Sequence, residues 1–173
     1  MSNLALLRQQ AEEDAIVSQD MTIATTGGGG KLFPAGYAFC RLVEYIEQGD
    51  HMQSHNGVAK GYAPEAQLAF AVWGDGIQND DGTPAIVPLW AFNMSTNDKA
   101  RAFKLFKKLN YKGTAKRFSQ LLGEGYLMLI EHGKPKKAGD PIKHQVNLEG
   151  FLPPYDAMTK APYPIPEAAD NLY

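Results

Sequence analysis

Lysine and arginine residues in the second half of the chain have the clearest chemical potential. The segment from residue 99 to residue 117 contains eight of them and no acidic residue: Lys99, Arg101, Lys104, Lys107, Lys108, Lys112, Lys116 and Arg117. Three more lysines, Lys134, Lys136 and Lys137, lie close together further along the chain. Because clustered cations neutralise phosphate groups and release their counterions, this pattern is typical of a surface that binds a polyanion.

The charge is distributed unevenly along the chain. The formal net charge is −2, but residues 1–98 carry 4 basic and 12 acidic residues, a balance of −8. Residues 99–143 carry 12 basic and 3 acidic residues, a balance of +9, and residues 144–173 return to −3. A nucleic acid would therefore meet a basic middle region between acidic ends.

Aromatic residues supply the second requirement of a nucleic-acid interface, because a flat ring that stacks on a base contributes about 1–3 kcal/mol. Trp73 and Trp90 are the strongest candidates, since each lies in a predicted strand. The further candidate binding residues combine rings with nearby cations, and they are Tyr37, Phe39, Arg41, Lys60, Tyr62 and Tyr111.

No group of residues has the spacing of a catalytic or metal centre. His51 and His55 lie in a segment rich in Gly and Asn with no third ligand nearby, and the acidic residues of 75–81 lack the spacing of a calcium loop. The glycines of 27–30 are followed by Lys-Leu, where a phosphate-binding loop requires Ser or Thr after the lysine. Cys40 is the single cysteine and lies among apolar strand residues. We expect no enzymatic activity, no metal and no cofactor.

The alternation of apolar residues predicts five strands and one main helix. We expect strands at 33–49, 67–73, 85–94, 126–132 and 143–151. Residues 95–98 are good helix-capping types and predict a helix through Leu109, with a short helical piece at 114–122. The segments 50–64 and 133–140 are predicted to be loops.

This order of elements predicts a mainly β protein, with a five-stranded OB-fold-like Greek-key barrel and a helix between strands 3 and 4. In such a barrel the ligand lies across strands 2 and 3, between the two loops that carry Lys60 with Tyr62 and Lys134 with its neighbours. The predicted domains are a flexible N-terminal arm at 1–31, the OB domain at 32–152, and a loosely held, Pro-rich tail at 153–173.

The composition is that of an ordinary globular protein, with 44% hydrophobic and 21% charged residues. No apolar run approaches the ~18 residues that span a bilayer, and the first residues lack the features of a secretory signal. We expect a cytoplasmic protein that does not enter a membrane.

The stretch from about Phe33 to Tyr155 resembles the OB-fold, replication-associated single-stranded DNA-binding proteins encoded by tailed bacteriophages. The resemblance lies in PAGYAFCRLVEYIEQGDH, QLAFAVWG, WAFNMSTNDKARAFKLFKKLNY and FSQLLGEGYLMLIEHG. It implies a protein that coats transient single strands in phage DNA replication, repair or recombination, in the cytoplasm of an infected bacterial host. By position it points to Arg41 and to the aromatic residues of strands 1 to 3.

The resemblance also implies that replication or recombination proteins bind the C-terminal tail. Such tails are strongly acidic and end in an aromatic residue, whereas here Glu167 and Asp170 alone precede Tyr173. Two other hypotheses stay open: a phage protein–protein interaction module on an OB-like barrel, such as a host-defence inhibitor or a virion component, and an RNA-binding protein.

Overall fold

The computed structural model of the chain describes residues 31–135, 137, 139–169 and 172. All of these residues except Lys31 belong to a unit that extends from Leu32 to Tyr173. The N-terminal arm predicted for residues 1–31 therefore lies outside the described residues except for Lys31.

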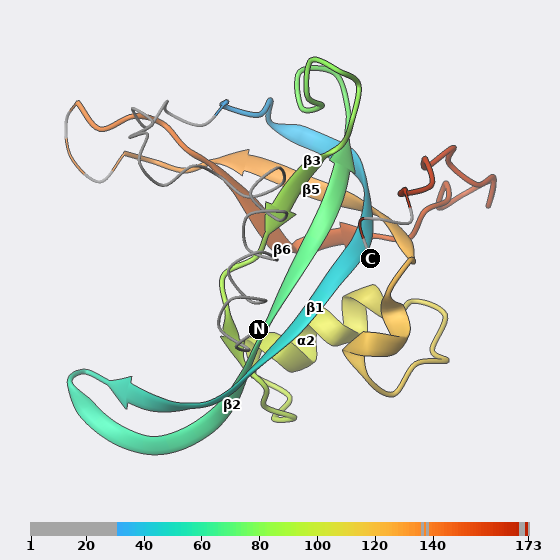
Figure 1. Cartoon of the computed structure of the whole chain (residues 1–173). Helices are drawn as coiled ribbons and strands as arrows, with labels where there is room; N and C mark the ends of the chain where they lie inside the picture. Colours follow the sequence, from blue (N-terminus) through green and yellow to red (C-terminus); the bar gives the residue numbers. More distant parts are fainter. Residues whose placement is uncertain (1–30, 136, 138, 170–171, 173) are drawn as a thin grey trace, which may run out of the picture. The chain divides into compact units, whose positions relative to one another are not determined.

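The described part of the chain forms a six-stranded antiparallel sheet with one α-helix (Figure 1). The elements are β1 (Gly36–His55), β2 (Val58–Trp73), β3 (Ala85–Pro88), β4 (Phe92–Asn93), α2 (Arg101–Leu109), the 3-10 helix η1 (Phe118–Leu121), β5 (Gly125–His132) and β6 (His144–Leu152). The strands are ordered β3-β2-β1-β5-β6, and β4 also pairs with β2.

The prediction of a mainly β fold is confirmed, and α2 falls between the first strands and the last two, as predicted. The prediction of one continuous strand at 85–94 is wrong. The N–H of Leu89 still donates to the carbonyl oxygen of Leu68 at 2.8 Å, but the regular strand ends at Pro88, and pairing resumes at Phe92 and Asn93 with the register shifted by one residue. The sheet is not closed into a barrel, because no pairing joins β3 to β6 among the described strands.

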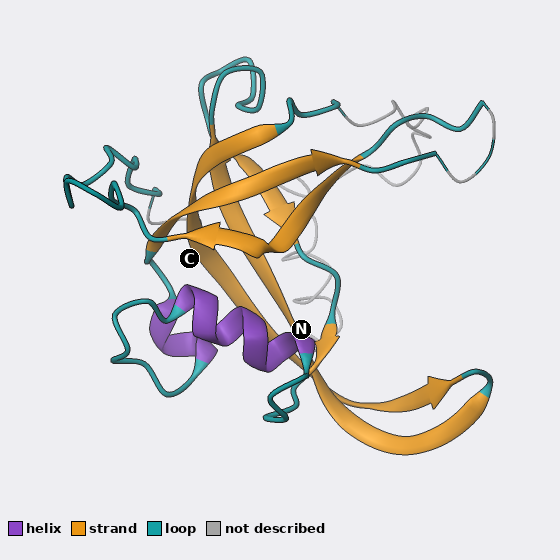
Figure 2. Ribbon diagram, turned by 180° about the vertical axis from the view of Figure 1, so that it is seen from behind, coloured by secondary structure: helices purple, strands orange, loops and turns teal. Residues whose placement is uncertain are grey.

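The first two strands continue far beyond the body of the unit as a hairpin, so the loop predicted at 50–64 is wrong. Asn56 and Gly57 both have positive φ, at 51° and 76°, as the central residues of a tight hairpin turn require. The β1–β2 pairing has register shifts at three places, and Lys60 lies at the one nearest the turn. Such bulges increase strand twist, and the hairpin curves away from the body in Figures 1 and 2.

The core lies between the inner face of the sheet and α2. Leu42, Leu68 and Phe70 are fully buried and belong to the same cluster as Leu105 and Leu109 of the helix. The apolar stripe of α2 therefore packs inward, while the lysines of the helix remain exposed. Figure 2 shows the helix lying across the strands.

The boundaries of the helical segments differ from those predicted. The α2 helix begins at Arg101, because Asn97 uses its side-chain oxygen to accept the N–H of Lys99 at 2.9 Å in a preceding turn. The predicted helical piece at 114–122 shortens to η1, in which Phe118 and Leu121 are buried.

Candidate nucleic-acid interface

The sheet has an outer face, which is the face that α2 does not cover. At β3 this outer face presents a row of exposed apolar side chains. Along β3 and the segment after it, Ala85, Val87 and Leu89 are buried, whereas the residues between them, Ile86, Pro88 and Trp90, are exposed. Trp90 is 85% exposed and Ile86 is 46% exposed. Strand alternation directs this second set away from the face that α2 covers.

Two projections extend from the same side of the ribbon as the β3–β4 segment (Figures 1 and 2). One is the β1–β2 hairpin, which carries Lys60 and Tyr62, both exposed. The other is the β5–β6 loop, in which Lys134 and Lys137 are exposed. Lys136 lies outside the described residues. The segment with the exposed indole ring, the hairpin and the lysine-bearing loop are thus three separate parts of the chain that lie on one side of the ribbon.

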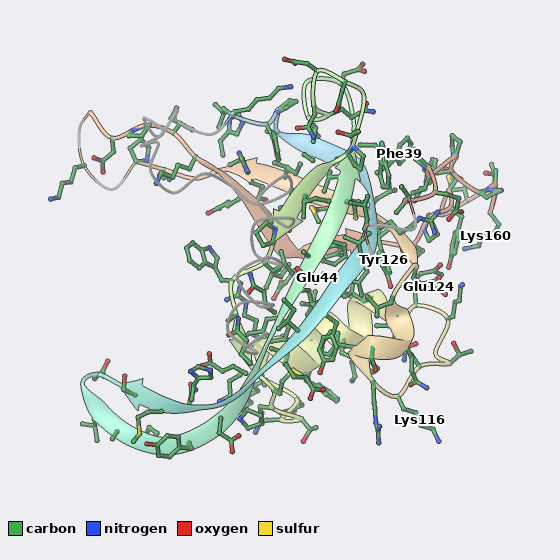
Figure 3. The ribbon with its side chains drawn as sticks, in the orientation of Figure 1. Phe39, Glu44, Lys116, Glu124, Tyr126 and Lys160 are labelled. Carbon is green, nitrogen blue, oxygen red and sulfur yellow. The ribbon has the colours of Figure 1, made fainter. Side chains whose placement is uncertain are left out.

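The C-terminal segment covers another part of the outer face, instead of being loosely held. Ala168 packs in a buried cluster with Val43, Ala71 and Trp73, and Trp73 is only 7% exposed. The ring of Tyr163 contacts Phe39, with 6.1 Å between the centroids. Figure 3 shows Phe39 close to this segment. Trp73 and Phe39 therefore offer little ring surface to a base in this structure.

Arg41 is held by the same C-terminal segment. Its guanidinium donates to the carbonyl oxygens of Pro166, at 3.1 Å, and Gly123, and it forms an ion pair of 2.8 Å with Glu167. The side chain of Arg41 is 12% exposed. Gly125 allows this close packing, because a Cβ there would lie 3.2 Å from Ile165. The structure thus uses Arg41 to attach the C-terminal segment.

Tyr37 differs from its neighbours on β1. It is 54% exposed and pairs with Leu129 of β5, next to the covered Phe39. Its ring therefore remains available at the end of the sheet.

A second basic surface lies on α2, and it is distinct from the outer face. A pocket between the helix and β6 is lined by Leu105, Leu148, Glu149 and five cations, which are Lys99, Arg101, Lys104, Lys107 and Lys108. Lys107 also lies over the ring of Phe103, 4.7 Å from its centroid. Because α2 packs on the inner face, this α2 groove does not adjoin the row that contains Trp90.

Two of the predicted residues serve the structure between α2 and β5. Lys112 pairs with Glu124 at 2.7 Å, and the hydrogen bond that Lys112 donates to the Glu124 carboxylate raises the pKa of the lysine. Tyr111 packs edge to face against Tyr126 and Tyr155, and burial raises its pKa. Neither side chain belongs to the outer face or to the α2 groove.

Ile86, Pro88 and Met52 were not among the residues predicted from the sequence, although local signals for their exposure exist. The alternation from Ala85 to Leu89 assigns Ile86 and Pro88 to one face. The Asn56-Gly57 pair predicts a hairpin, in which Met52 lies directly opposite Tyr62.

The reactive groups are dispersed. No cluster of three or more His, Cys, Asp or Glu side chains suited to a metal ion occurs among the residues that the structure describes. Cys40 is fully buried, and its burial raises the pKa of the thiol, which makes it a poor nucleophile. Within the same described ranges, no helix is long and apolar enough to cross a membrane.

Comparison with known proteins found no family model and no curated protein that matches this chain.

Proposed function

We propose that the chain binds single-stranded DNA, without sequence specificity, across the outer face of β2 and β3. The observation that carries the proposal is the 85% exposure of Trp90, in line with the exposed Ile86. An indole exposed just beyond the end of β3 offers a ring face for stacking. Such stacking tolerates any sequence, because every base has a π-face.

The β5–β6 loop supplies the charge that a base-stacking surface needs. Lys134 and Lys137 are exposed, and the sequence between residues 133 and 139 contains three lysines and no acid. Phosphate neutralisation by these side chains adds affinity for any strand, independent of its sequence.

The strand order supports the same site. An OB barrel opened between its third and last strands is compatible with the order β3-β2-β1-β5-β6. Barrels of this type bind oligonucleotides over strands 2 and 3 and between two loops. The resemblance to phage proteins extends the proposal to DNA replication, repair or recombination in an infected bacterium, with phage replication or recombination proteins as partners of the C-terminal segment.

A titration with fluorescently labelled oligo-dT tests the proposal. Affinity should fall with salt, with a log-log slope of about −0.7 per phosphate neutralised. A matched duplex should bind more weakly, because its bases are not free to stack. A flat salt response, or equal affinity for the duplex, would refute single-strand binding. Stronger competition by a matched RNA oligomer would instead assign the site to RNA.

Replacement of Lys134, Lys136 and Lys137 with Ala tests the loop. The triple variant should bind all sequences more weakly, and the salt slope should become shallower by about 2, since each neutralised phosphate contributes about 0.7. Lys116→Ala is the control, because Lys116 is exposed beside η1, away from the loop (Figure 3). An unchanged slope in the triple variant would exclude the loop from the site.

A further inference from the structure

The β1–β2 hairpin has the wrong charge for a phosphate clamp. From residue 44 to residue 65 the sequence contains four acidic residues, Glu44, Glu47, Asp50 and Glu65, against Lys60 as the one cation. Asp50 and Glu47 are exposed. Because like charges repel, this hairpin is better suited to a basic partner than to a nucleic-acid backbone.

The hairpin also exposes apolar side chains near its end. Tyr62 is 71% exposed and Met52 is 53% exposed, and the two lie directly opposite each other on paired strands. Val58, beside the turn, is 60% exposed. Beyond the body of the unit no other described strand pairs with the hairpin. A two-stranded ribbon is marginally stable by itself in water, so contact with a partner would stabilise it.

The α2 groove has the complementary properties. Five cations line it, and Glu149 is the acidic residue that shares the lining. Glu149 offsets little of this charge, because its carboxylate lies 4.0 Å from Lys104 and both side chains are largely exposed. Leu148 is half-buried and adds apolar surface between the cations, whereas Leu105 is buried at the floor of the groove. The pocket volume of about 670 Å³ is sufficient for two large side chains.

We propose that the hairpin of one copy of this chain docks in the α2 groove of a second copy. Tyr62 and Met52 would contact Leu148 and the aliphatic parts of the groove lysines, while Asp50 and its acidic neighbours face the charged ends of those lysines. The hairpin projects away from the body of its own chain, so a second molecule has to supply the groove (Figure 1). Because the two surfaces are different, the contact is heterologous and can continue from copy to copy.

This proposal does not depend on DNA binding, and it is tested without nucleic acid. Sedimentation equilibrium of the full chain at low salt should show dimers or larger species, and higher salt should dissociate them. Asp50→Lys in the hairpin and Lys108→Glu in the groove should each weaken association by roughly tenfold or more. Asp75→Lys and Lys116→Glu are the controls, because they make the same charge changes at exposed positions outside the hairpin and the groove.

A mixture of the two variants provides the sharpest measurement. The Lys108→Glu chain has an intact hairpin and the Asp50→Lys chain has an intact groove, so the mixture should recover an association that neither variant shows alone. Thermal unfolding of each variant should match the unaltered chain, since both positions are exposed. If either variant unfolds, Tyr62→Ser replaces it as a neutral test of the same contact, with the same weakening expected.

Three results would overturn the proposal. The first is a monomer at all concentrations in low salt. The second is association that persists in Asp50→Lys, which would assign the groove to another acidic segment, such as the one containing Glu12 and Glu13. The third is a loss of oligo-dT affinity in Lys108→Glu with no effect on self-association, which would assign the groove to DNA.

Discussion

Replacement of Trp90 with alanine separates binding from folding more cleanly than any other single change in this protein. Because 85% of Trp90 is exposed, its removal should change the free energy of unfolding by no more than about 0.5 kcal/mol. If the ring stacks on one base, its loss should cost about 1–3 kcal/mol of binding free energy. At 1.4 kcal/mol per factor of ten, that is a loss of roughly 5- to 150-fold in affinity. The assay is fluorescence anisotropy of labelled oligo-dT, with urea unfolding of the same samples.

Trp73→Phe is the matched control, since Trp73 is only 7% exposed and packs against Val43, Ala71 and Ala168. It should lower stability and leave the affinity of the folded protein nearly unchanged. It also leaves Trp90 as the remaining tryptophan, whose fluorescence oligo-dT should quench. If Trp90→Ala binds oligo-dT as tightly as the unaltered chain, or if the fluorescence of Trp90 does not respond, stacking on the outer face of the sheet is excluded.

Three further predictions concern stability. The hydroxyl of Tyr126 is buried with no hydrogen-bond partner among the described residues, so Tyr126→Phe should raise the free energy of unfolding by about 1 kcal/mol in urea, and a loss would indicate a bound water or another partner. A Cβ at Gly150 would lie 2.5 Å from the Cβ of Leu129, so Gly150→Ala should lower the urea midpoint by an amount equivalent to about 1–3 kcal/mol, which an unchanged midpoint would contradict. Burial lowers the pKa of His144, whose ring accepts the N–H of Phe33 at 3.4 Å, so the unfolded chain binds the proton more readily. Stability should therefore fall as the pH drops through about 6.5 toward the lower folded pKa. Melting curves recorded between about pH 8 and about pH 5 should show that the stability of His144→Gln depends less on pH than that of the unaltered chain. An equal pH dependence in the two proteins would show that His144 is not the source.

The local sequence pattern was sufficient to predict those strands and helices whose two sides differ in polarity. The alternation from Ala85 to Pro88 and the stripe formed by Ala102, Leu105 and Leu109 each predicted a strand or a helix, and the structure contains both. Such patterns work because one buried face imposes a period of 2 on a strand and of 3.6 on a helix.

The hairpin shows where that method fails. Residues 50–64 are polar and contain glycines, which is typical of a loop. They are nevertheless strands, because they continue the β1–β2 pairing that begins with the core residues of both strands. The Asn56-Gly57 turn was a local signal, but neither flanking strand has a buried face at this end. The sequence therefore assigned Lys60 and Tyr62 to a loop, whereas they lie on β2 in the β1–β2 hairpin.

The sequence by itself determined a mainly β protein with a basic middle region and aromatic strands, because composition and alternation are local properties. Only the tertiary structure decided which of the two tryptophans predicted to lie in strands is available to a ligand. Trp73 is covered by Ala168, which lies far along the chain, whereas Trp90 lies where the described residues leave 85% of it exposed. Arg41 was predicted to bind the ligand, yet its guanidinium pairs with Glu167 and donates a hydrogen bond to the carbonyl oxygen of Pro166. Exposure depends on contacts between segments distant in sequence, and no local pattern contains that information.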